Sequence, residues 1–186
     1  MIVEDRISCG LAALAEAKAF MRIDGPGEDT IVAGLIEAAC AVCEAFVGQM
    51  LIVRGVTQSV VASGAWTRLG RTPVASVTDI VLVGDAVALP AVGAHAVDID
   101  ENGDGWVRHG GTYFTSGQTL RIAYRAGLAI GWTEVPAALR HGVVRLAAHL
   151  YAHRDADEPP AAVAALWRPY RRMPFGRGAV RRGLYA

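Results

Sequence analysis

The sequence predicts an α+β fold in which a helical bundle core of about four helices carries a β-rich antiparallel insertion and an extended C-terminal arm. Apolar residues recur at helical spacing near both ends of the 186-residue chain. Between them lie short β-branched runs separated by Gly, Pro and Asp. The final residues are rich in Gly and Arg and show no periodicity. We therefore expect residues 1–50 and 132–168 to form the helical core, 51–131 the insertion and 169–186 the arm.

Two helices are expected at the N-terminal end. The first covers Leu11–Ile23 and stops at Asp24-Gly25-Pro26-Gly27, a strong helix break. The second covers Asp29–Val47, with acidic residues favouring its start and Gly48 suited to its C-cap. The apolar stripe of this second helix is expected to consist of Ile31, Leu35, Ala38 or Ala39, Val42 and Phe46, widened by Val32, Ile36, Cys43 and Val47.

In the middle of the chain the sequence predicts five strands, with no helices between them. Turns are indicated at Gly84-Asp85 and at Asn102-Gly103. Because no helices separate the strands, an antiparallel sheet or sandwich is favoured over a parallel nucleotide-binding sheet. The expected strands are Ile52–Val61, Ser76–Val83, His95–Ile99, Trp106–His109 and Leu120–Tyr124.

Helical spacing returns after Gly131. A helix is expected to open at Val135-Pro136, where proline suits the first turn, and to run to about Arg154. Acidic residues and Pro159-Pro160 then interrupt it. A short helix over Ala161–Trp167 precedes the arm.

Composition indicates a protein made in a reducing cytoplasm, and we expect no transmembrane helix. Glu37 and Glu44 interrupt the longest apolar stretch, which falls short of the roughly 20 clean residues that a span needs. The N-terminal residues lack the basic and apolar regions of a secretory signal. Three cysteines without a regular spacing fit buried thiols better than disulfides.

Charge is distributed unevenly although the chain is neutral overall. All six charged residues from Trp167 onward are arginines, which leaves 12 basic against 18 acidic residues in the rest of the chain. The body therefore carries about −6 and the C-terminal end about +6. These arginines are Arg168, Arg171, Arg172, Arg177, Arg181 and Arg182.

The sequence gives little support to two candidate metal sites and one candidate redox motif. The segment Asp98–Gly103 matches the first half of an EF-hand loop, but position twelve is His109 in place of glutamate, so a β-hairpin turn is favoured. His149 and His153 lie four residues apart on a helix, without an acidic ligand on the same face. Cys40-Ala41-Val42-Cys43 is a CxxC in mid-helix, where buried structural thiols are favoured.

Enzymatic machinery is not indicated. The sequence lacks the glycine-rich motifs that bind phosphates and the GxSxG motif of a nucleophile elbow. We therefore expect no enzyme, no cofactor and no metal. A metal-dependent hydrolase using the histidines is a remote alternative.

Three blocks of sequence, in order along the chain, resemble the head–tail connector (adaptor) family of long-tailed phages and gene transfer agents. The first is a Leu-x-Glu-Ala-Lys helix followed by a linker and a long helix, and the second is a strand ending in Tyr-x-x-Gly. The third is a proline-started helix with Tyr-x-x-Arg and a closing Leu-x-x-Pro-Tyr-Arg. The blocks are Leu14–Asp24 with Asp29–Val47, Leu120–Gly127, and Val135–Arg154 with Leu166–Arg171.

The resemblance implies a structural ring protein, commonly of twelve copies, at the head–tail interface of a virion or phage-like particle assembled in the bacterial cytoplasm. Such a ring binds under the portal, accepts a tail-completion (stopper) protein and surrounds the DNA channel without sequence-specific DNA binding. Ring subunits need two different complementary patches and little chemistry.

The arginine-rich end is the candidate partner-binding segment. Arg, Trp and Tyr are frequent interface anchors, and a segment that orders on docking can wrap a large surface. The alternative is a small DNA-binding protein that uses the same arginines on phosphates. We expect the portal to be bound by Trp167, Arg168, Tyr170, Arg171, Arg172, Phe175, Arg177, Arg181, Arg182 and Tyr185.

Overall fold

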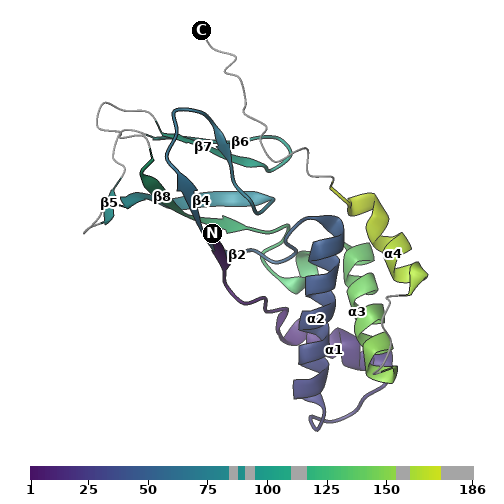
Figure 1. Cartoon of the computed structure of the whole chain (residues 1–186). Helices are drawn as coiled ribbons and strands as arrows, with labels where there is room; N and C mark the ends of the chain where they lie inside the picture. Colours follow the sequence, from purple (N-terminus) through teal and green to yellow (C-terminus); the bar gives the residue numbers. More distant parts are fainter. Residues whose placement is uncertain (84–87, 91–94, 110–116, 154–159, 173–186) are drawn as a thin grey trace. The chain divides into compact units, whose positions relative to one another are not determined.

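The computed structural model describes residues 1–83, 88–90, 95–109, 117–153 and 160–172. The chain forms two compact units, one of strands and one of helices (Figure 1). The strand unit contains Met1–Asp5 and Arg54–Gly127, and the helical unit contains Arg6–Val53 and Leu128–Met173. The α+β fold class and the antiparallel character of the sheets are confirmed.

The helical unit has four α-helices, two from each half of the chain. They are α1 (Gly10–Met21), α2 (Asp29–Val47), α3 (Ala137–Ala152) and α4 (Ala161–Trp167), with short 3-10 turns at Trp132–Glu134 and Arg168–Tyr170. Pro136 and Pro160 stand just before α3 and α4, where a missing N–H costs nothing. The predicted bounds of α2 and α4 are confirmed, α1 and α3 each end two residues before their predicted ends, and α1 begins one residue early.

The core of the helical unit lies between α2 and α3. Small residues Ala13 and Ala17 let α1 approach the other helices closely, and Trp167 fills the space beside α3. By length and composition α2 is the one helix among the described residues that could cross a membrane, a property that core helices of soluble proteins share. Its buried residues belong to this core: Val32, Ile36, Ala39, Cys40, Cys43 and Val47.

The predicted stripe of α2 was partly wrong. Ile31 and Val42 are 56% and 39% exposed, whereas the positions expected only to widen the stripe are its buried centre. A helix of this composition is apolar on several sides, so spacing alone could not identify which side meets the core. Leu11, at the start of the first predicted helix, is 82% exposed.

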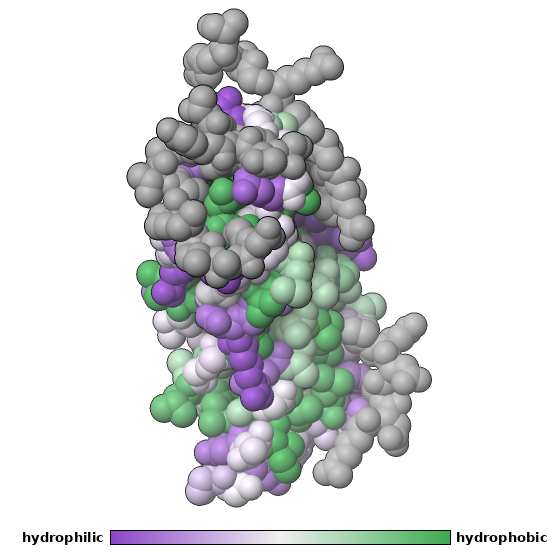
Figure 2. Space-filling view, turned by 60° about the vertical axis from the view of Figure 1, so that its left-hand side comes forward, coloured by the Kyte–Doolittle hydropathy of each residue, from purple (hydrophilic) through white to green (hydrophobic). Residues whose placement is uncertain are grey.

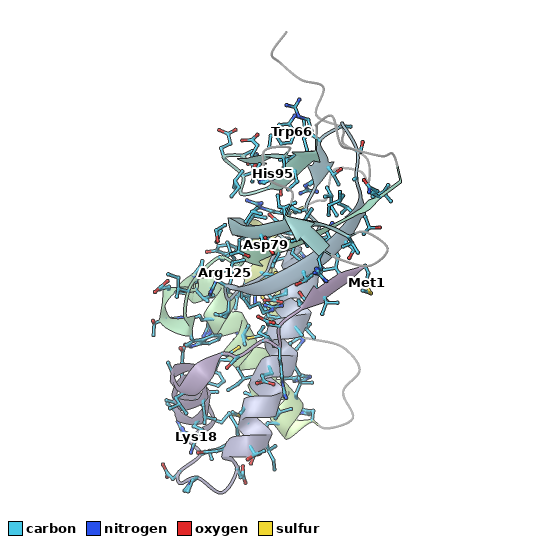
Figure 3. The ribbon with its side chains drawn as sticks, turned by 90° about the vertical axis from the view of Figure 1, so that its left-hand side faces the viewer. Met1, Lys18, Trp66, Asp79, His95 and Arg125 are labelled. Carbon is cyan, nitrogen blue, oxygen red and sulfur yellow. The ribbon has the colours of Figure 1, made fainter. Side chains whose placement is uncertain are left out.

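The linker between α1 and α2 is held by a partly exposed ion pair and a hydrogen bond, both made by Lys18. The Nζ atom of Lys18 donates to the Asp29 carboxylate and to the carbonyl oxygen of Gly25. Lys18 lies at the end of α1 next to this linker (Figure 3). Because the side chain bridges the linker and the first turn of α2, it ties the end of α1 to the start of α2.

The strand unit has a five-stranded and a three-stranded antiparallel sheet. The larger sheet has the order β1-β2-β8-β4-β5, and the smaller has the order β3-β7-β6. The strands are β1 (Ile2–Glu4), β2 (Arg54–Val61), β3 (Thr67–Arg68), β4 (Val74–Val83), β5 (Ala88–Pro90), β6 (His95–Ile99), β7 (Gly105–His109) and β8 (Thr119–Ala126). The five predicted strands are confirmed within two residues at each end. The short strands β1, β3 and β5 were not predicted.

Strand β8 occupies the centre of the larger sheet. Its residues alternate, with Ile122 and Tyr124 buried and Arg121 and Arg125 exposed. The Tyr124 hydroxyl donates to Gln58 on β2 at 3.1 Å and accepts from the backbone N–H of Arg71 at 3.1 Å. Burial raises the pKa of Tyr124 to about 12, so the hydroxyl stays a donor.

Candidate partner-binding site

The first residues of the C-terminal arm are hydrogen-bonded to the end of α2. The backbone N–H of Arg172 donates to the Val47 carbonyl at 2.8 Å, and Nε2 of Gln49 donates to the Tyr170 carbonyl at 2.7 Å. Gly48 ends α2 with a positive φ of 71°, and a Cβ there would lie 3.0 Å from the Arg172 carbonyl oxygen. Glycine is therefore needed both for the helix end and for the close approach of the chain. These contacts hold Tyr170 and Arg172 against the end of α2.

Trp167 belongs to the core and not to the arm. Its side chain is 1% exposed, its indole N–H donates to the Leu139 carbonyl at 3.3 Å, and its ring lies 5.9 Å from that of Phe46. A side chain buried this completely leaves no surface for a partner. The expectation that Trp167 contacts the portal is therefore replaced by a role in holding α3, α4 and α2 together.

The two arginines on either side of Pro169-Tyr170 are exposed. The guanidinium of Arg171 lies 5.6 Å from the centroid of the Phe46 ring, a cation–π distance. Tyr170 is half-buried against the helical core, and Arg172 is partly exposed. The remaining predicted contacts, Phe175, Arg177, Arg181, Arg182 and Tyr185, lie outside the described residues. Among the described residues, the site thus consists of the first residues of the arm, held against the end of α2, with two exposed arginine side chains. We call this part of the chain the anchored base of the arm.

The cysteines of the CxxC motif are buried in the core of the helical unit. Cys40 and Cys43 are fully buried, and the Sγ atoms of Cys9 and Cys40 are 2.8 Å apart. The hydrogen bond with Cys9 and burial raise the pKa of the Cys40 thiol, and burial raises the pKa of the Cys43 thiol. Raised pKa values disfavour the nucleophilic thiolate, so the prediction of buried structural thiols is confirmed.

The other weak motifs have structural explanations. The Asp100 carboxylate accepts from the backbone N–H groups of Asn102 and Asp104 and from the indole of Trp106, which makes it the centre of the β6–β7 turn. Gly103 has the positive φ that this turn requires, as predicted. The rings of His149 and His153 stack at 4.7 Å. Within the described ranges no group of three or more His, Cys, Asp or Glu side chains is placed to hold a metal ion.

The exposed apolar side of α2 is the surface feature that the sequence interpretation missed. Figure 2 shows apolar residues, in green and pale green, exposed over the helices in the lower half of the view. The sequence signal was present, because α2 has only two charged residues between Thr30 and Val47 and they lie seven apart. This exposed side was not expected because the predicted stripe assigned Ile31 and Val42 to the core.

Comparisons with solved structures match the chain from end to end. A chain in the neck of an empty GTA particle computed with C6 symmetry is 25% identical with a TM-score of 0.77, covering 96% of this chain and 98% of that chain. A chain in the virion of a native gene transfer agent (GTA) particle is 27% identical with a TM-score of 0.76 and the same coverage. A chain in the neck of a native GTA particle computed with C12 symmetry, at 24% identity, covers 95% of this chain and 98% of that chain with a TM-score of 0.68 and has the same fold.

No protein-family model and no curated protein matches the sequence. The structural matches extend over both units and nearly the full length of each chain compared. They give no support to the DNA-binding alternative. The comparisons confirm the resemblance inferred from the sequence: the chain is a structural protein of the head–tail connector (adaptor) kind, with the fold of a gene transfer agent neck protein.

Proposed function

We propose that this protein forms a ring of twelve copies that joins the portal of a gene transfer agent or phage particle to its tail. The ring surrounds the DNA channel, with a tail-completion (stopper) protein on its other side. The observation that carries this proposal is the match over 96% of the chain to proteins of the GTA neck and virion. The C6 and C12 symmetry of the neck structures supports a closed ring of subunits.

We propose further that the portal is bound by the segment from Arg168 onward. The anchored base at Gly48 and Gln49 fixes the origin of the arm, and the exposed guanidinium groups of Arg168 and Arg171 face solvent there. The segment from Arg168 onward has six arginines and no acidic residue, which suits an acidic groove on the partner, since complementary charge speeds and orients docking. The role is structural and requires no catalysis.

Deleting residues 173–186 is expected to abolish portal binding while leaving the subunit folded. The cut preserves the Arg172–Val47 and Gln49–Tyr170 hydrogen bonds, so the thermal midpoint should not change. Loss of several anchors should weaken binding to purified portal by about 100-fold or more, roughly 3 kcal/mol. Binding is measured by co-sedimentation and by calorimetric titration of the full portal ring.

Two double variants with charge reversals of equal size, one in the arm and one outside it, provide a matched comparison. Arg181→Glu with Arg182→Glu should reduce portal binding, whereas Arg121→Glu with Arg125→Glu, on the exposed face of β8, should leave it unchanged. Unchanged binding after the deletion would remove the arm from the portal interface. If the arm instead gives the chain a steeply salt-dependent affinity for duplex DNA in isolation, the DNA-binding alternative is supported.

A further inference from the structure

Helix α2 presents to solvent a face without a single charged residue. We define the α2 face as Ile31, Gly34, Ala38, Ala41, Val42 and Ala45, all exposed and adjacent on one side of the helix. The solvent side of a surface helix ordinarily carries charged and polar residues. The α2 face lacks them over about four turns, roughly 21 Å. Its composition is that of a helix side covered by another protein surface.

The carboxylates that border the α2 face are held within the subunit. Glu37 pairs with Arg6 at 2.8 Å, and Glu44 accepts a hydrogen bond from the backbone N–H of Leu51 at 2.7 Å. Neither carboxylate needs a partner from outside. A helix that approached the α2 face would therefore meet only methyl groups and the backbone of Gly34. Small residues of this kind allow interaxial distances near the short end of about 8–10 Å.

Helix α1 carries a second uncharged face on another side of the unit. We define the α1 face as Leu11, Ala12, Ala15 and Ala19. The opposite side of α1, with Ala13 and Ala17, packs in the core against α2 and α3. The α1 face therefore points away from α2 of the same subunit and cannot cover the α2 face. Leu11, at 82% exposed, projects from it as a single large apolar side chain.

We propose that the α1 face of one copy docks on the α2 face of the next, and that this contact closes the ring. This inference rests on the proposed function and specifies its subunit interface. A cyclic ring requires two different patches on each subunit that match each other, and the two faces meet that requirement. Leu11 fits as a knob over the shallow Gly34, Ala38 and Ala41 surface. The chains that this protein resembles are arranged in C6- and C12-symmetric necks, which makes a second copy the occupant.

Site-specific crosslinking tests the contact. The double variant Leu11→Cys with Ala41→Cys, treated with a short bismaleimide while assembled alone or on purified portal, should give a ladder of covalent oligomers. Each single variant should give none, because the two faces pair only with each other. The wild-type chain should also give none, since its own three cysteines are buried. Covalent dimers from Ala41→Cys alone would show a symmetric α2–α2 contact and overturn the proposal.

Charge substitutions give an independent result. Leu11→Glu and Ala41→Glu should each prevent ring formation by sedimentation velocity, whereas Ala137→Glu, at an exposed position of α3 outside both faces, should assemble as wild type does. All three sites are exposed, so folding should be retained. Rings that form normally with Leu11→Glu and with Ala41→Glu would overturn this interface and leave the proposed function standing. A wild-type chain that forms no ring with or without portal would overturn the proposed function itself.

Discussion

Replacing Trp167 by alanine is expected to lower the free energy of unfolding of the helical unit by about 3–5 kcal/mol. The indole is the largest side chain that is fully buried. It contacts the Phe46 ring and donates its N–H to the Leu139 carbonyl at 3.3 Å. Its removal would leave a cavity between α2, α3 and α4 and would remove one hydrogen bond to the Leu139 carbonyl. Because this helical contact fixes the base of the arm, portal binding should weaken as well.

The Trp167→Ala effect is measured by urea unfolding followed by far-UV circular dichroism. Trp66→Ala is the matched control, because the Trp66 ring is half-buried in the strand unit under the guanidinium of Arg108. Its loss should cost less than the loss of Trp167. If the midpoint for Trp167→Ala lay within 1 M urea of the wild-type midpoint, at an m-value of roughly 1–3 kcal/mol per M, a core position for Trp167 would be contradicted.

Gly142→Ala is expected to destabilise the helical unit although alanine is the better helix former. A Cβ at position 142 would lie 2.1 Å from Nε1 of Trp167 and 2.8 Å from its Cε2. The helix propensity gain is about 1 kcal/mol, whereas displacing a packed indole costs about 1–3 kcal/mol and breaks its bond to Leu139. The steric cost should therefore exceed the gain in helix propensity, and the free energy of unfolding should fall by about 1–2 kcal/mol.

A double-mutant cycle attributes the Gly142 effect to the indole. In the Trp167→Ala background the added methyl group has room, so Gly142→Ala should become neutral or stabilising. Chemical unfolding of the four proteins measures the coupling. Additive effects of the two substitutions would show that the Gly142 position is restricted by something other than Trp167.

The helices were predictable where their ends carry strong local signals. Asp29 and Gly48 mark the ends of α2, and Pro160 with Pro169 brackets α4, because these residues act through backbone geometry that needs no tertiary contact. The side of α2 that faces the core was not predictable in the same way. With Ile31 and Val32 both apolar, only the positions of the neighbouring helices decide which one is buried.

The short strands and the burial of Trp167 could not be predicted because they depend on residues far away in the sequence. Strand β1 has three residues and forms only because β2 offers an edge, pairing Val3 with Thr57. Trp167 sits beside arginines in the sequence and was therefore included among the expected portal contacts. The absence of a side chain at Gly142, 25 positions earlier, is what makes room for it in the core. Packing between segments that lie far apart in the sequence cannot be recognised from the spacing of residues within one segment.

The most direct test of the connector assignment is electron cryo-microscopy of the purified protein mixed with the portal of the same particle. The account predicts a closed ring of twelve copies on one end of the portal, coaxial with its channel, with the arms reaching the portal and α1 of each copy against α2 of its neighbour. Portal particles without added density, together with monomers or open filaments of this protein, would contradict it.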